Sequence, residues 1–506
     1  MTTALAVSLA LSPLIVVAVG ALLLMLVEAF STNPVHQGMP DPATGGMALG
    51  ATAVLFAGAA FAGTLWMVGI DQVGDVSALA PWLIFDRFSL FFDMTLCLGG
   101  GLAALLAGGY LAEHRLDRGE FYMLVLFATL GAMILAAAGD ALTLFLGLET
   151  MSIGVYAMTA FRRASARSAE GALKYFLLGS FAAAILLFGF ALLYGATGHT
   201  DLAGIGASTR TVGGHSPLFI MGAVLVLVGM VFKVSAVPFH AWTPDAYEGA
   251  PTPATTFMAV AVKAAAFAML LRVLTLSLGD AGWTSWGTGW PPVMATLAVL
   301  TMTVANLIAG RQESVKRMLA YSSIAHAGYL LIGVTALMTG PAQAEASVLY
   351  YLLGYTVSTA GAFGALIFCG SRGREAVSYE DLSGLGKRHP GPALAFALFL
   401  VSLAGVPPTA GFFGKWFVFK AAIEGGLYWL AVLGLINSVI GAYYYLRVLV
   451  YMYMREPAAG APVAVPMRSG YVSAALIVSA ILVLALGLTP TRYLDLAIGA
   501  ATFGTG

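Results

Sequence analysis

Charged residues and cysteines are both scarce in this sequence. Only 9% of its 506 residues are charged, whereas soluble proteins carry about 25%. This composition excludes an ordinary soluble domain, and it leaves no basic stripe for nucleic acid. The two cysteines, Cys97 and Cys369, lie far apart in apolar runs, so no Cys or His cluster is available for zinc, an iron–sulfur centre or covalent haem. Glycine-rich phosphate loops and nucleophile elbows are also missing, so we expect no cofactor and no metal in this chain.

Long apolar runs are abundant instead, and hydrophobic residues make up 60% of the chain. Each run can cross a hydrocarbon core of about 30 Å. Lipid permits only helices or closed barrels, and these runs are too long for barrel strands. We therefore predict an all-α, polytopic membrane protein; its first run has no basic leader, so we expect a retained span. The fourteen predicted spans cover residues 4–29, 46–70, 86–111, 120–138, 140–161, 171–195, 217–249, 254–279, 290–309, 317–339, 345–370, 391–424, 426–454 and 469–489.

The basic residues orient these spans. Loops after odd-numbered spans hold fourteen Lys and Arg residues, whereas loops after even-numbered spans hold only Arg87 and Arg210, and the tail holds Arg492. Lys and Arg concentrate in short loops on the cytoplasmic side of a membrane. We therefore predict that the odd loops are cytoplasmic and that both termini lie outside.

Three charged residues lie deep inside predicted spans. Glu149 is about 12 Å from the outer end of its span by helical rise, and Lys233 and Lys263 are flanked by apolar residues. A charge at the centre of a membrane helix costs about 2.5–3.5 kcal/mol, so such residues are functional candidates. An amine whose carboxylate partner approaches and withdraws can take up and release a proton. We predict that Glu149 accepts protons and that Lys233 or Lys263 is its partner; a pair that only holds helices together is the alternative.

Other polar residues in the spans leave two interpretations open. Lys174 lies within a turn of the predicted cytoplasmic end of its span, where a lysine can also reach the membrane surface. His326, in LAYSSIAHAGYLL, is either a packed hydrogen-bonding residue or a proton carrier. Lys420 and Glu424 are four residues apart, which predicts an ordinary pair on a helix surface.

Two spans contain prolines that interrupt a helix. Pro238 lies in the span 217–249, five residues after Lys233, and Pro407 and Pro408 lie in the span 391–424, shortly before Lys415. Proline removes a helical hydrogen bond and clashes with the preceding turn, and discontinuous membrane helices mark ion sites in transporters. We therefore predict two discontinuous helices at functional positions.

The two interrupted spans are five apart in order, which predicts an internal repeat. Because five is odd, the two copies must be inverted relative to each other in the membrane. The predicted divisions are residues 1–118 with three N-terminal helices, 119–279 with the first repeat, 280–456 with the second repeat and 457–506 with the last helix. In this arrangement each repeat forms a half-channel: Glu149, Lys233 and Lys263 serve the first, and Lys415 serves the second.

Five sequence segments together resemble a known family. They are GLETMSIGVY, EGALKYFLLGS, FKVSAVPFHAWTPDAYEGAPTP, KRMLAYSSIAHAGYLLIG and SLAGVPPTAGFFGKWFVF. They are similar to segments of the antiporter-like subunits of respiratory complex I, which are related to subunits of multisubunit Na⁺/H⁺ antiporters and membrane-bound hydrogenases. The resemblance runs from about residue 80 to residue 455. Lys415 distinguishes the chain from the M-type subunits, which typically have Glu there, and the short tail distinguishes it from the L-type.

The resemblance implies a proton-translocating subunit of NADH–quinone oxidoreductase in a bacterial inner membrane. The family's proton-path residues fall on Glu149, Lys174, Lys233, Lys263 and Lys415. Electron transfer would take place elsewhere in the complex, with no cofactor in this chain, and the implied partners are K-type and M-type neighbours and the lipid bilayer. The depths of Glu149 and Lys174 in their spans predict that these two residues are not in direct contact.

Two other functions fit parts of the sequence. A subunit of a cation/proton antiporter or of a membrane-bound hydrogenase would share the interrupted helices, and an antiporter would respond to Na⁺ without needing NADH. A structural scaffold would use its buried charges only to pair helices. In that case, loss of the charges would damage assembly but leave the turnover of assembled complexes intact.

Overall fold

The computed structural model describes residues 2–30, 42–116, 118–211, 216–339, 341–370, 373–457 and 463–501. Within these residues the chain is helical apart from loops and three isolated β-bridges. Twelve of the described helices are long and apolar enough to cross a membrane. Two shorter apolar helices, α9 (Pro217–Lys233) and α17 (Pro390–Ala404), account for the remaining predicted spans. The prediction of an all-α membrane protein is therefore confirmed.

The predicted spans correspond to helices in chain order. The first span is two helices, because Pro13 leaves a helical carbonyl without its donor near the junction. The bounds are α1 Thr3–Ala10, α2 Ser12–Phe30, α3 Pro42–Val68, α4 Arg87–Glu113, α5 Glu120–Ala137, α6 Ala141–Thr159, α7 Ala166–Thr197, α11 Thr252–Phe257, α12 Lys263–Leu276, α13 Pro291–Ala309, α14 Val315–Ala336, α15 Pro341–Phe368, α19 Tyr428–Met454 and α20 Gly470–Leu488.

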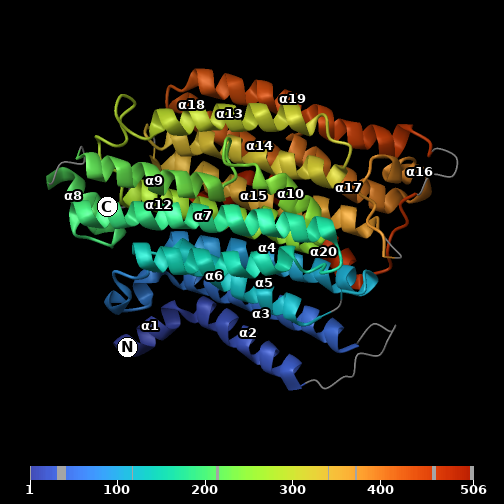
Figure 1. The fold of residues 1–506 in the computed structure, drawn as a ribbon, viewed down its shortest axis with the longest axis horizontal. Coiled ribbons are helices and arrows are strands. Elements are labelled where there is room, and N and C mark those ends of the chain that lie inside the picture. The colour runs from blue at the N-terminus through green and yellow to red at the C-terminus, as the bar shows by residue number, and fades with distance from the viewer. Residues whose placement is uncertain are drawn as a thin grey trace.

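The span with Pro238 and the span with Pro407 and Pro408 are both discontinuous, as predicted. The first consists of α9, a turn over residues 234–241 and α10 (Trp242–Gly249). The second consists of α17, a turn over residues 405–409 and α18 (Ala410–Glu424). In Figure 1, α9 lies toward the end of the bundle that carries both termini and α10 toward the other end, whereas α17 and α18 follow the reverse order. The two interrupted helices thus run in opposite directions.

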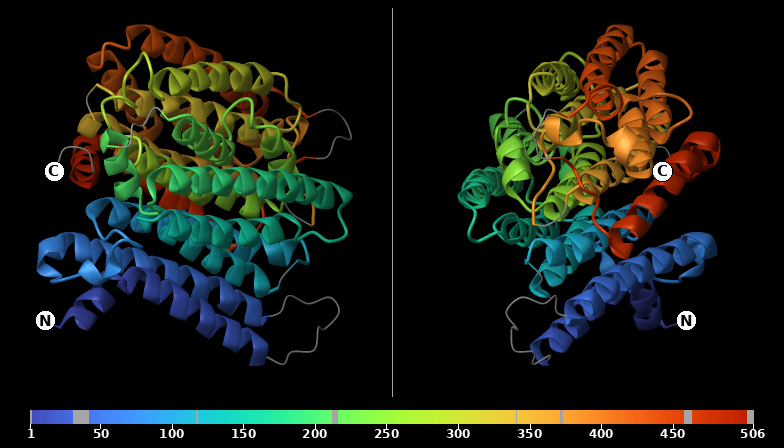
Figure 2. Two further views of the ribbon diagram at one scale, coloured as in Figure 1. Left: turned by 60° about the vertical axis from the view of Figure 1, so that its left-hand side comes forward. Right: turned by 90° about the vertical axis from the view of Figure 1, so that its right-hand side faces the viewer.

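The two ends of the bundle differ in charge. The helices next to the termini, α1 and α21 (Pro490–Ala500), lie at one end together with α8 (Leu202–Thr211), while α16 (Leu385–Arg388) lies at the other (Figures 1 and 2). We call these the termini end and the basic end. Arg162, Arg317 and most other loop cations lie at the basic end. The side chain of Arg210 and all of Arg372 lie outside the described residues.

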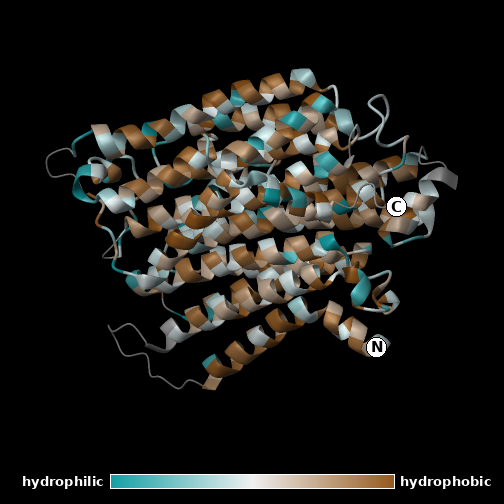
Figure 3. Cartoon of the chain, turned by 180° about the vertical axis from the view of Figure 1, so that it is seen from behind, coloured by the Kyte–Doolittle hydropathy of each residue, from teal (hydrophilic) through white to brown (hydrophobic). Residues whose placement is uncertain are grey.

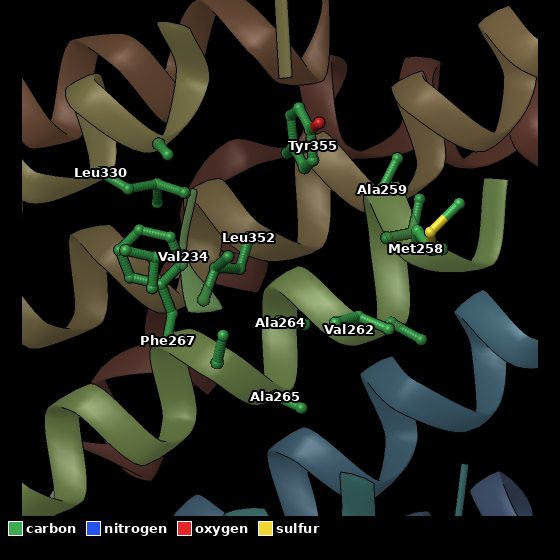
Figure 4. Close-up of a cluster of buried hydrophobic side chains, with 14 of the residues drawn as sticks. Val234, Met258, Ala259, Val262, Ala264, Ala265, Phe267, Leu330, Leu352 and Tyr355 are labelled. Carbon is green, nitrogen blue, oxygen red and sulfur yellow. The ribbon is translucent and has the colours of Figure 1, made fainter. Parts of the chain in front are cut away.

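The most buried helix lies at the centre of the bundle. It consists of α11, a π-helical turn at Met258–Val262 and α12, and its apolar stretch is wholly buried. Side chains of this helix, among them Val262, Ala264 and Phe267, share one buried cluster with Leu330 and Tyr355 (Figure 4). By contrast α2, α7 and α19 expose large apolar side chains, as expected of helices that face lipid. Isolated hydrophilic segments nevertheless occur in mid-bundle (Figure 3).

Candidate functional site

Glu149 and Lys233 line one small cavity inside the bundle. Asp140 caps the start of α6 by accepting from the backbone N–H of Leu142, at 2.7 Å, which sets where Glu149 falls along the helix. The cavity has a volume of about 10 Å³, close to the smallest space that holds one water. One oxygen of Glu149, Oε1, is buried without a hydrogen-bond partner in the described part of the chain. The sequence left open which lysine neighbours Glu149, and the cavity pairs it with Lys233.

Neutral groups beside Glu149 hold the Lys233 amine. Lys233 Nζ donates to Ser152 Oγ at 2.7 Å, and it lies 5.7 Å from the ring centre of Tyr156 and 5.6 Å from that of Tyr175. Ser152 and Tyr156 follow Glu149 by three and seven residues on α6, so all three lie on one face of that helix. No ion pair between Lys233 and Glu149 occurs within 4.0 Å in the described chain. The amine is therefore held next to the carboxylate but not by it.

Lys263 begins α12 directly after the π-helical turn at the centre of the bundle. Its Nζ donates to the backbone carbonyl of Ser323 on α14 at 2.5 Å, and it lies 5.7 Å from the ring centre of Tyr355. The residue is only 3% exposed. Among the described residues no carboxylate forms an ion pair with it, so a backbone carbonyl and an aromatic face stabilise a fully buried amine.

His326 lies near both Lys263 and Lys415. Its ring nitrogens are 2.7 Å from the Tyr351 hydroxyl and 3.0 Å from the Tyr445 hydroxyl. The charges of both lysines act on the His326 ring. Of the two interpretations that the sequence left open, the structure shows hydrogen bonding between packed helices; the proton-carrier role stays a prediction.

Lys415 occupies the second discontinuous helix. Its Nζ donates to the carbonyl of Ala404 at 2.9 Å and to Ser438 Oγ on α19 at 2.8 Å, and it lies 5.1 Å from the ring centre of Tyr329. Ala404 is the last residue of α17, and Lys233 is itself the last residue of α9. A helix C-terminus carries a partial negative charge and free carbonyls. Each helix break thus has a lysine at the C-terminal end of the preceding half-helix, Lys233 as its last residue and Lys415 through its hydrogen bond to Ala404.

Lys174 lies apart from the buried amines of Lys233, Lys263 and Lys415. Its Nζ is 2.7 Å from Glu170 and 2.7 Å from Asp245, and Asp245 in turn is 2.9 Å from Arg317. The Lys174 side chain is 44% exposed. Its partners line a cavity of about 310 Å³ at the basic end. As the depths predicted, Lys174 pairs with acids other than Glu149.

Glu375, which the sequence did not single out, forms a buried ionic network at the basic end. It accepts from Tyr110 at 2.5 Å and from Thr252, and it lies 3.4 Å from Arg162 and 3.5 Å from Lys316. Burial raises the pKa of Glu375, but the charges of Lys316 and Arg162 and the two hydroxyl donors outweigh it and lower the pKa to about 2. No local signal separates this residue from other loop acids, because its partners come from four distant segments.

Arg272 and Lys420, two further basic residues in the spans, have acidic partners. Arg272 forms a bidentate salt bridge with Asp86, with Nη1–Oδ2 and Nη2–Oδ1 distances of 2.6 and 2.7 Å. Lys420 and Glu424 are 3.5 Å apart on the surface of α18, as their spacing predicted. Within the described residues, no group of three or more His, Cys, Asp or Glu side chains could hold a metal ion.

Comparison with known proteins places these residues in a family. A family described as NADH:quinone oxidoreductase/Mrp antiporter matches residues 138–441, which include all six candidate residues. The chain is 67% identical to NADH-quinone oxidoreductase subunit N 1 of Sorangium cellulosum, over 97% of this chain and 98% of that protein. This chain belongs to the subunit N family. It is also 42% identical to subunit N of Myxococcus xanthus, over 95% of this chain and 94% of that protein.

Solved structures of the antiporter-like group share the fold. A chain of respiratory complex I from Thermus thermophilus aligns with a TM-score of 0.78 at 35% identity, over 96% of this chain and all of that chain. A chain of the Mrp complex from Dietzia aligns with a TM-score of 0.82 at 23% identity, over 99% of this chain and 97% of that chain. The second likeness shows the fold alone. The predicted family is thus confirmed, and the subunit N relatives distinguish it from the antiporter alternative.

Proposed function

We propose that this chain is a proton-translocating membrane-arm subunit of a bacterial NADH–quinone oxidoreductase. The family supports the complex, and one structural observation supports the proton path. Lys233, Lys263 and Lys415 are 6%, 3% and 6% exposed, yet no carboxylate within ion-pair distance in the described chain neutralises any of them. A scaffold would pair its buried charges, as Arg272 pairs with Asp86. Amines held only by neutral groups are suited to gaining and losing protons.

The path would run from Glu149 through Lys233, Lys263 and His326 to Lys415. Ionised Glu149 attracts the Lys233 ammonium across the shared cavity and so favours its charged form. Neutralisation of Glu149 removes that attraction, and the amine, held by Ser152, can pass its proton inward. Tyr355 and Tyr329 both lie beside His326, with ring centres 5.0 and 5.8 Å from its own. This polar chain would connect the two half-channels, residues 119–279 and 280–456.

Lys174 would act at the entrance to this path. Its cluster with Glu170, Asp245 and Arg317 faces the cavity at the basic end, which we assign to the cytoplasmic side. Both termini would then lie on the periplasmic side of the bacterial inner membrane. Electron carriers would reside in other subunits, and K-type and M-type subunits would be the neighbours. The names of the subunit N relatives support membership of such a complex.

The experiment that tests this function compares Lys233→Ala with Lys420→Ala. Lys420 is the matched control, because it is also a lysine in a discontinuous span but is paired on the surface. Inverted membrane vesicles carrying each variant would be assayed for NADH oxidation with quinone and for NADH-driven acidification, with the abundance of the complex measured in parallel.

We expect both activities to collapse in Lys233→Ala at normal abundance and to persist in Lys420→Ala. Wild-type activity in Lys233→Ala would make that lysine structural and would contradict the path. Loss of assembly in Lys233→Ala, with normal turnover per assembled complex, would favour the scaffold. Acidification that needs Na⁺ and not NADH would favour the antiporter.

A further inference from the structure

An apolar slot lies at the termini end, away from the proton path. It has a cavity volume of about 200 Å³ and is walled by α3, α4, α15, α20 and α21. The hydroxyl of Thr95, the polar group on its α4 wall, already donates to the carbonyl of Phe91 at 2.9 Å. Its lining includes Trp66, Phe91, Leu98, Leu353, Leu486 and Tyr493. Such a wall accepts a hydrocarbon chain and disfavours a hydrated or charged group.

The innermost α4 residue of the slot lies about one leaflet's depth from Arg87. Arg87 begins α4 at the termini end, and Leu98 lies eleven residues further along the helix. At 1.5 Å per residue this is about 16 Å. Half of a hydrocarbon core of about 30 Å is about 15 Å. A single acyl chain that enters beside Arg87 would therefore reach the inner end of the slot near the middle of the membrane.

Two exposed arginines adjoin residues that line the slot. The Arg87 guanidinium stacks over the ring of Trp66, 5.5 Å from its centre, and Arg492 directly precedes Tyr493. Asp86, the acid next to Arg87, is already engaged by both terminal nitrogens of Arg272. In the described part of the chain, neither Arg87 nor Arg492 has a carboxylate within 4.0 Å.

The position of these arginines is informative because basic residues are rare at this end. The sequence places only Arg87, Arg210 and Arg492 in the loops and tail of the termini end. Two of the three adjoin lining residues of the same apolar slot, since Arg87 stacks on Trp66 and Arg492 precedes Tyr493. Tryptophan and tyrosine at its mouth are residues that favour the headgroup region of a bilayer. Apolar depth, aromatic rim and unpaired positive charge together match an anionic amphiphile.

We propose that this slot binds one acyl chain of an anionic phospholipid, with the phosphate held by Arg87 and Arg492. A headgroup of net negative charge matches two arginines better than a zwitterionic one, whose own cation would be repelled. A quinone would also fill an apolar slot, but its neutral headgroup gives no reason for two unpaired cations. The bound lipid would join α21 to α3 and α4 through its chain.

The test uses the purified, assembled complex in vesicles. The probe is phosphatidylglycerol with a photoactivatable group in one acyl chain, and labelled peptides are mapped after illumination. We expect labelling within residues 91–98 and 482–486. Each arginine near the membrane surface raises the affinity for an anionic lipid about fivefold. Half-maximal labelling should therefore need about fivefold more probe in Arg87→Gln or Arg492→Gln, and about 30-fold more in the double variant.

The matched control is Arg455→Gln. Arg455 is likewise an exposed arginine stacked on an aromatic ring, 4.1 Å from the centre of Tyr451, but it lies at the basic end. Its replacement should leave labelling of the slot unchanged. A second variant, Val357→Trp, fills the slot and should abolish labelling of Leu98 at any probe concentration.

Three results would overturn the proposal. One is labelling of the double arginine variant at wild-type probe concentrations. Another is equal labelling by a phosphatidylcholine probe of the same chain length, since the slot would then not select charge. The third is displacement of the bound probe by a quinone at equal concentration. If Val357→Trp does not assemble, the arginine variants, whose side chains are exposed, still decide the question.

Discussion

Replacing Glu375 with Gln should destabilise the protein measurably. In the folded chain the pKa of this carboxyl is about 2, against an ordinary value of 4.5. Each pKa unit corresponds to about 1.4 kcal/mol, so the ionised carboxylate contributes about 3 kcal/mol at neutral pH. Glutamine would also leave Lys316, which is 1% exposed, without its counter-ion. Breaking a buried pair in this way typically costs about 3–5 kcal/mol, which agrees with the first figure.

The sign of the pH dependence follows from the lowered pKa. Because the folded pKa lies below the unfolded one, the contribution of Glu375 is present above pH 4.5 and is lost as the pH falls toward about 2. The stability difference between wild type and Glu375→Gln should therefore shrink across that window. At neutral pH it should be at its maximum.

The assay is thermal unfolding of the purified complex, with Glu456→Gln as control. Glu456 pairs with Lys387 at the same end of the molecule, but their side chains are 80% and 70% exposed, so we expect little change. The double variant Glu375→Gln/Lys316→Met should recover part of the loss, because it removes both buried charges. If Glu375→Gln unfolds at the same temperature as Glu456→Gln, the reasoning on the buried network is wrong.

Three further predictions concern the proton path. Lys415→Ala should assemble normally but lose NADH-driven acidification, because within the described residues no other lysine donates to the carbonyl at the end of α17. Lys420→Ala should retain acidification, and equal activity of the two variants would contradict the path. Glu149→Gln should leave Lys233 without an approaching carboxylate and lower both NADH oxidation and acidification, and unchanged rates at normal abundance would remove Glu149 from the path. Gly405 has φ +89°, and a Cβ atom there would lie 3.1 Å from the Lys415 side chain. Gly405→Ala should therefore lower the free energy of unfolding by about 1–2 kcal/mol and reduce acidification. Gly391 has open space around it, so Gly391→Ala should change neither the melting temperature nor the rate of acidification.

The predicted spans and helix breaks needed no knowledge of the tertiary structure. An apolar run of membrane length is a property of neighbouring residues, and lipid leaves helix as its only conformation here. The breaks at residues 234–241 and 405–409 follow equally locally, since a proline removes a hydrogen bond wherever it occurs in a helix. Glu149, Lys233, Lys263 and Lys415 were conspicuous for the same reason, because a charge in an apolar run is costly.

The partners of these charges were decided by tertiary structure alone. Lys233 meets Ser152, 81 residues away, and Lys263 meets the carbonyl of Ser323, 60 residues away. Lys174 lies with Asp245, and Glu375 gathers groups from up to 265 residues away. Hydrophobic periodicity shows which residues enter the membrane but not which helices become neighbours. The sequence by itself thus determined where charge enters the membrane. Only the packing of helices decided that the buried amines lie among hydroxyls, carbonyls and rings, because those contacts join segments that no local pattern relates.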